Sequence, residues 1–117
     1  MIQNRRLVYY PDVIKTIERF PADTCEVIYH ALEEARLGGK HLQVKPLAGF
    51  KGASTLEIRD SSGGRAFRVV YTTELKDKIV VLLAFEKKSK SGISTPRHQI
   101  DLVHKRLKEA RSRFGDK

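Results

Sequence analysis

Residues 63–90 read GGRAFRVVYTTELKDKIVVLLAFEKKSK, and this stretch decides the fold. Its centre, Ile79–Phe85, is a run of seven apolar residues. Such a run predicts a strand that is buried on both faces and lies inside a sheet. Basic residues follow the run at Lys87, Lys88 and Lys90. We therefore expect a buried strand that leads directly into a cationic loop.

The preceding segment, Phe67–Thr72, predicts a second strand, in which side chains alternate between the two faces. Phe67 and Val69 then lie on one face and Arg68 on the other. The alternation places a guanidinium on a sheet face, next to the buried strand.

A third strand is predicted at Thr55–Asp60, joined to the second by the turn sequence SSGG at residues 61–64. If these four residues form the loop, Ile58 lies opposite Phe67, so that apolar residues match across the pair. The same register places Glu57 opposite Arg68.

The remaining elements follow from periodicity and from proline and glycine signals. They are an edge strand at Leu7–Tyr10, a helix from Pro11 to the break at Pro21, a helix over Asp23–Leu37, an irregular segment at 43–47, and a helix that begins at Thr95-Pro96. The predicted order is βααβββα. We expect one α+β domain over residues 1–117, with helices packed on one face of a mostly antiparallel sheet.

The composition is strongly basic: 23 Lys and Arg against 14 Asp and Glu give a net charge of +9. A small domain with this charge typically binds a polyanion. A single cysteine, Cys25, excludes an internal disulfide and a multi-cysteine zinc site, which fits a reducing cytoplasm. No signal peptide and no long apolar run are present, so we expect a soluble cytoplasmic protein without a membrane partner.

Motifs for metal or cofactor binding are absent from the sequence, and we expect neither. His98 and His104 are six residues apart on the predicted helix and do not share a face. What remains is a cationic set that suits phosphate, formed by Lys51, Arg59, Arg65, Arg68, Lys87, Lys88 and Lys90. The alternatives are a structural salt bridge between Arg68 and Glu57 and a solvated lysine loop.

Several short motifs in a fixed order resemble the RelE/ParE toxin superfamily, and in particular its phage-derived HigB-like branch. They are KPL at 45–47, LEIR at 56–59, RVVY at 68–71, FEKK at 85–88 and TP at 95–96. The resemblance covers roughly residues 43 to 110, and the helical N-terminal part agrees in order and length. It implies a RelE-like fold, with a twisted antiparallel sheet, two N-terminal helices and one C-terminal helix.

The resemblance also implies a function. The protein would be the toxin of a type II toxin–antitoxin pair, and RelE-like members cut mRNA in the ribosomal A site without a metal. Its partners would be mRNA, the ribosome, and an antitoxin from the adjacent gene, usually with a helix-turn-helix.

Site residues follow from the same resemblance. Arg68 matches the arginine that contacts the scissile phosphate, and Lys88 or its neighbour Lys87 matches the basic residue after the buried strand. Arg59 matches the arginine that ends the preceding strand, and Arg65 would help to orient the RNA backbone. The family's C-terminal catalytic tyrosine or histidine has no clear equivalent here. Glu57 and His98 are then the candidate acid and base.

Two other functions are compatible with the sequence. A ParE-like toxin has the same fold but inhibits DNA gyrase through protein contacts. A basic nucleic-acid-binding protein without catalytic activity would also explain the charge.

Overall fold

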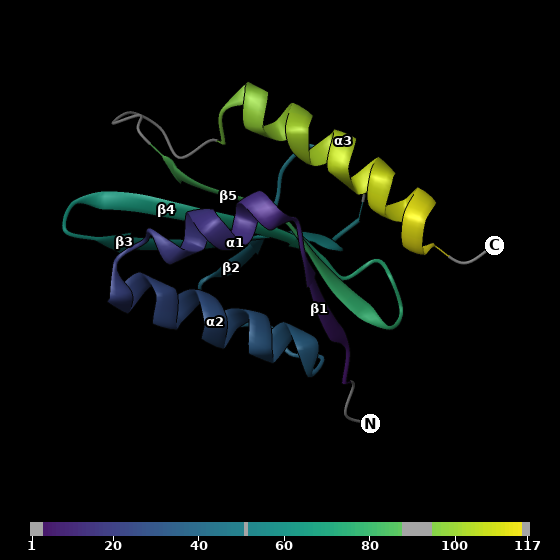
Figure 1. Ribbon diagram of the computed structural model, residues 1–117, viewed down its shortest axis with the longest axis horizontal. Helices are drawn as coiled ribbons and strands as arrows, with labels where there is room; N and C mark the ends of the chain where they lie inside the picture. The colour runs from purple at the N-terminus through teal and green to yellow at the C-terminus, as the bar shows by residue number, and fades with distance from the viewer. Residues whose placement is uncertain (1–3, 51, 88–94, 116–117) are drawn as a thin grey trace.

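The computed structural model describes residues 4–50, 52–87 and 95–115. Its elements are β1 (Arg6–Tyr9), α1 (Pro11–Glu18), α2 (Ala22–Arg36), β2 (Val44–Pro46), β3 (Thr55–Ser62), β4 (Arg65–Thr72), β5 (Lys78–Lys87) and α3 (Arg97–Phe114). Helices and strands are mixed along the chain, which confirms the predicted α+β class (Figure 1).

The sheet has five strands in the order β1-β5-β4-β3-β2. Only β1 pairs in parallel, with β5, while the other three pairs are antiparallel. Every residue of Ile79–Phe85 is buried, as the apolar run predicts. The edge position of β1 is also confirmed.

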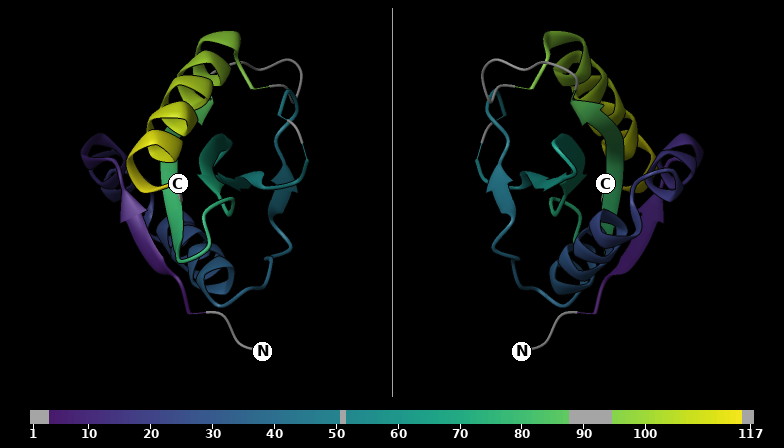
Figure 2. Two further views of the ribbon diagram at one scale, coloured as in Figure 1. Left: turned by 90° about the vertical axis from the view of Figure 1, so that its right-hand side faces the viewer. Right: turned by 90° about the vertical axis from the view of Figure 1, so that its left-hand side faces the viewer.

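The helices cover both faces of the sheet, so the prediction that they pack on one face is wrong. Val13 and Ile17 of α1 and Leu32 of α2 belong to one core cluster, whereas Val103 and Leu107 of α3 belong to a second cluster. Figure 2 shows α3 and α2 on opposite sides of β5. The physical reason is β5 itself, because a strand that is apolar on both faces needs a covering layer on each.

The β3–β4 hairpin differs from the predicted one by two residues. Ser62 pairs with Arg65, so the turn contains only Gly63 and Gly64, at φ of 59° and 78°. Two consecutive residues with positive φ are the signature of the tight two-residue turn that matches strand twist. Because the strand register is shifted by two residues, an even number, every side chain keeps its predicted face of the sheet. The opposed pairs change, and Arg68 lies opposite Arg59 rather than Glu57.

Residues 43–47, predicted as irregular, contain the short strand β2, whose residues Val44–Pro46 pair with β3. Pro46 is compatible with this strand because β2 lies at the edge of the sheet, where a missing N–H is tolerated.

A β-bulge in β5 helps to fix α3 on the sheet. Val70 lies opposite Leu83 and Tyr71 opposite Val81, so Leu82 is an extra residue in the ladder. The Leu82 carbonyl accepts a hydrogen bond from Arg106 Nη1 of α3 at 2.8 Å. None of the helices in the described part of the chain is long and apolar enough to cross a membrane.

Candidate functional site

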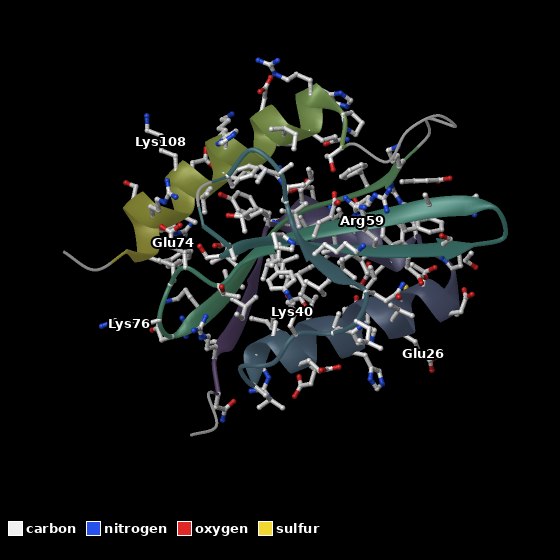
Figure 3. The ribbon with its side chains drawn as sticks, turned by 180° about the vertical axis from the view of Figure 1, so that it is seen from behind. Glu26, Lys40, Arg59, Glu74, Lys76 and Lys108 are labelled. Atoms are coloured by element: carbon white, nitrogen blue, oxygen red, sulfur yellow. The ribbon has the colours of Figure 1, made fainter. Side chains whose placement is uncertain are left out.

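The β3–β4 register gathers polar groups on the face of the sheet that α3 covers. Arg59 and Arg68 are cross-strand partners, and Glu57 precedes Arg59 by two residues on the same face. The second core cluster, which includes residues of α3, lies on this face through Val70. We call Glu57, Arg59, Arg68 and Thr95 the Arg68 cluster. Figure 3 labels Arg59 on the sheet.

The carboxylate of Glu57 is fully buried and engaged through both oxygens. Its Oε1 accepts a hydrogen bond from Arg59 Nε at 2.9 Å, and its Oε2 accepts one from Thr95 Oγ1 at 2.7 Å. A buried carboxylate is costly unless it is paired and hydrogen-bonded. These two contacts therefore explain how Glu57 is kept at this position.

Arg68 is the group in the cluster that lacks such partners. The residue is 8% exposed, and its buried Nε has no hydrogen-bond partner among the described residues. Burial lowers the pKa of the Arg68 guanidinium, the negative charge of Glu57 raises it, and the neighbouring Arg59 lowers it again. An arginine keeps its charge in proteins, so the cluster holds a buried cation with an unused donor.

Thr95 corrects the predicted start of the last helix. Pro96, not Thr95, is the N-cap of α3, and no side chain caps the helix. The Thr95 hydroxyl bonds Glu57 instead and ties the chain before α3 to the sheet. The Thr-Pro sequence is the usual signal for a cap, and nothing local in it indicates a carboxylate 38 residues away in the chain.

Arg65 does not join the cluster, although the sequence placed it among the phosphate-binding residues. Arg65 and Phe67 are two residues apart on β4, so their side chains point to the same face, opposite to that of Arg68. The Arg65 Cζ atom lies 5.0 Å from the centroid of the Phe67 ring. Its Nε and Nη2 both donate to the Glu86 carboxylate at 3.0 Å. This bidentate pair raises the pKa of the Arg65 guanidinium and occupies its Nε and Nη2 donors with a carboxylate.

Of the predicted lysines and His98, the structure describes only Lys87 and His98, and they lie on different elements. Lys87 lies opposite Ala66, hence on the Arg68 face, and is 6% exposed. His98 is exposed in the first turn of α3, three residues after Thr95. Lys51, Lys88 and Lys90 lie outside the described residues.

The loop between β2, at one edge of the sheet, and β3 also contacts α3. Phe50, in the connection from β2 to β3, stacks on His104 with ring centroids 4.1 Å apart. Phe50 also packs against the second core cluster. The pair adds an aromatic contact between this connection and the helix above the Arg68 face.

Comparison with known proteins gives one family match. A family model described as "Phage derived protein Gp49-like" matches residues 15–108, a span that includes α2, all strands after it and most of α3. No protein with a curated function matches the chain significantly.

Proposed function

We propose, from the premise that this chain belongs to the family of phage-derived Gp49-like proteins, that it is a toxin which blocks translation by cutting mRNA. The family is associated with the toxins of toxin–antitoxin systems, so a cognate antitoxin is the expected partner. The cleavage of mRNA, the need for the ribosome and the helix-turn-helix nature of the antitoxin belong to the proposal.

The observation that carries the proposal is the buried, unpartnered donor of Arg68. A phosphate oxygen is the kind of acceptor that a guanidinium binds most strongly, often through two parallel hydrogen bonds. Arg59 lies directly opposite and adds a second positive charge beside it. In a largely desolvated site, donors of this kind stabilise developing negative charge more than they would in water.

The proposed reaction needs no group beyond RNA and protein. The 2′-oxygen of a ribose attacks the adjacent phosphorus, a base takes the 2′-hydroxyl proton, and the new O2′–P bond replaces the P–O5′ bond. An acid gives a proton to the departing 5′-oxygen, so the products are a 2′,3′-cyclic phosphate and a 5′-hydroxyl. Arg68 stabilises the charge on the phosphorane, assisted by Lys88.

The contacts of Glu57 and the position of His98 suggest different roles for the two candidate acid–base groups. Because both oxygens of Glu57 are engaged, its proposed role is to orient Arg59 and Thr95 rather than to take a proton. His98 is exposed in the first turn of α3, three residues after Thr95, so its ring is accessible to a bound RNA. A positioned acid or base contributes about 10²–10⁴-fold.

Pulse-labelling after induced expression tests this function against the gyrase alternative. We expect incorporation of labelled amino acids to fall within minutes of induction, while DNA synthesis continues. The Arg19→Ala variant, altered at an exposed arginine at the end of α1, serves as a matched control and should arrest translation like the unaltered chain. An early stop in DNA synthesis with normal protein synthesis would overturn the nuclease proposal and favour a gyrase inhibitor.

A further inference from the structure

Phe50 and His104 form an aromatic stack above the Arg68 face of the sheet. Phe50 belongs to the loop between β2 and β3 and His104 to α3, and their ring centroids lie 4.1 Å apart with 22° between the ring planes. Phe50 is half-buried and packs against the second core cluster, whereas His104 is exposed. Phe50 covers only one face of the imidazole, so the rest of the exposed His104 ring is accessible to a ligand.

Holding the loop in place does not account for the exposed histidine. Phe50 is already anchored by its contacts with the second core cluster, so the loop does not need an exposed imidazole to stay on α3. An accessible ring with a second ring behind it is a surface on which proteins stack unpaired bases, and histidine and phenylalanine are both used in this way. The pair therefore suits a nucleobase of a single-stranded RNA.

Positive charges lie next to His104 on α3. Lys105 and Lys108 are exposed and form no ion pair within residues 4–50, 52–87 and 95–115. Lys108 is four residues after His104, so the two side chains are neighbours on one side of the helix. Figure 3 shows Lys108 on the outer side of α3. A phosphate next to a base stacked on His104 would meet this ammonium group.

The helix α3 leads from the Arg68 cluster to this stack. The Thr95 hydroxyl bonds Glu57 of the cluster just before the helix begins at Arg97. His104 lies seven residues after Arg97, which is about 10 Å along the axis at a rise of about 1.5 Å per residue. An RNA strand whose scissile phosphate is at Arg68 can therefore reach His104 with a flanking nucleotide.

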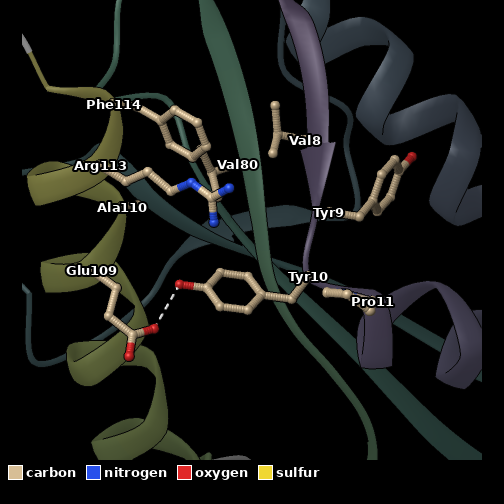
Figure 4. Close-up of a pocket in the computed structure, with 9 residues that line it drawn as sticks. All are labelled: Val8, Tyr9, Tyr10, Pro11, Val80, Glu109, Ala110, Arg113 and Phe114. Carbon is tan, nitrogen blue, oxygen red and sulfur yellow. Dashed lines mark hydrogen bonds between the residues drawn. The ribbon is translucent and has the colours of Figure 1, made fainter.

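The side of α3 that faces β1 is less suited to RNA. It borders a groove of about 490 Å³ between β1 and the C-terminal half of the helix (Figure 4). The lining contains one basic and one acidic side chain, Arg113 and Glu109, so the groove carries no net charge. The Glu109 carboxylate accepts a hydrogen bond from Tyr10 Oη at 2.9 Å. We therefore place the RNA on the His104 side of the helix, where the lysines are unpaired.

We propose that Phe50 and His104 form a stacking site for one base of a single-stranded RNA, and that Lys108 binds a phosphate beside that base. The stacked nucleotide flanks the cleaved one and anchors the strand while Arg68 contacts the scissile phosphate. Because every base has a π-face, the site adds affinity without a strong sequence preference. The location next to a cleaved phosphate rests on the proposed function, whereas the stacking itself does not.

Binding of oligonucleotides with and without bases tests the stacking site. One probe is a fluorescent 2′-O-methyl pentaadenylate, which has no 2′-hydroxyl to attack and is not cleaved. The other is an abasic chain with the same number of phosphates. Anisotropy titrations with the purified full chain measure both affinities. We expect His104→Ala to weaken binding of pentaadenylate about 5–20-fold, as for the loss of one stacked base, and to leave binding of the abasic chain unchanged.

Two further variants separate stacking from other effects of the histidine. His104→Tyr keeps an aromatic ring at an exposed position and should retain most of the binding of pentaadenylate. His30→Ala, at an exposed histidine of α2, is the control and should bind both probes like the unaltered chain. Circular dichroism checks that each variant is folded.

A matched pair of charge variants tests the phosphate contact. Lys108→Ala and Arg113→Ala each remove one positive charge from an exposed position of α3, but Arg113 lines the groove rather than the His104 side. Lys108→Ala should weaken binding of both probes and lower the slope of log affinity against log salt by about 0.7, as for the loss of one phosphate contact of a single strand. Arg113→Ala should change the slope less.

The stacking site is overturned if His104→Ala binds pentaadenylate as the unaltered chain does, or if it loses the same factor for both probes. Equal salt slopes for Lys108→Ala and Arg113→Ala would overturn the phosphate contact. The stacking site and the proposed function can fail separately. Base-dependent loss in His104→Ala with unaffected protein synthesis in pulse-labelling would retain the stacking site and reject mRNA cleavage. Loss of cleavage in Arg68→Ala with unchanged RNA binding by His104→Ala would do the reverse.

Discussion

At the scale of single residues, the contact between Thr95 and Glu57 links the chain before α3 to the Arg68 cluster. Thr95→Val keeps the shape of the side chain but leaves a buried carboxylate oxygen without its donor. We expect the free energy of unfolding to fall by about 1–3 kcal/mol, since a buried acceptor is left unsatisfied. Thr95→Ser restores a hydroxyl and should recover most of the loss in urea unfolding. Equal stability of the valine and serine variants would show that the hydrogen bond contributes nothing.

The direction in which Arg68 points could be predicted from the sequence, but its partners could not. Period-two alternation places Arg68 on the face opposite Phe67, and the structure agrees. The same alternation places the Arg65 side chain on the face of Phe67. The sequence alone could therefore have shown that Arg65 and Arg68 lie on opposite faces of the sheet. The residue opposite Arg68, which is Arg59 rather than Glu57, depended on the length of the turn, and the sequence SSGG left that length ambiguous.

At the scale of elements, the Gly63-Gly64 turn sets the register that assembles the cluster. Gly63 has a φ of 59° and open space where a side chain would stand, so conformation rather than contact decides the cost of substitution. Gly63→Val should lower the free energy of unfolding by about 1–2 kcal/mol, because a β-branched residue resists positive φ. Gly63→Asn should be close to neutral, since asparagine suits this turn. If both variants unfold at the same urea concentration, the two-residue turn is contradicted.

Predictability of the elements followed the strength of their local signals. The first two helices and the long strands have clear periodicity and appear within a few residues of their predicted ends. The strand Val44–Pro46 was missed because three residues with a proline carry no periodic signal, and only pairing with β3 makes them a strand. The placement of helices on both faces was implied by the apolar run Ile79–Phe85, but the predicted one-sided packing did not use it.

At the scale of the whole molecule, two different features lie near the two ends of α3. The Arg68 cluster lies on β3 and β4 and is tied to the beginning of α3, while the groove lies between β1 and the end of α3. In the proposed account, RNA binds at the Arg68 cluster. The parallel pairing of β1 with β5, which creates the groove, joins segments about 70 residues apart and has no local sequence signal.

The most direct measurement of the central claim is RNA cleavage by variants of Arg68, assayed on translating ribosomes with purified protein. Arg68→Ala should reduce cleavage by about 10²–10³-fold, as for the loss of one preorganised donor. Arg68→Lys keeps the charge but loses the fork, so it should retain partial activity. Arg19→Ala is the control, and circular dichroism confirms that each variant is folded. Full cleavage by a folded Arg68→Ala variant would contradict the account.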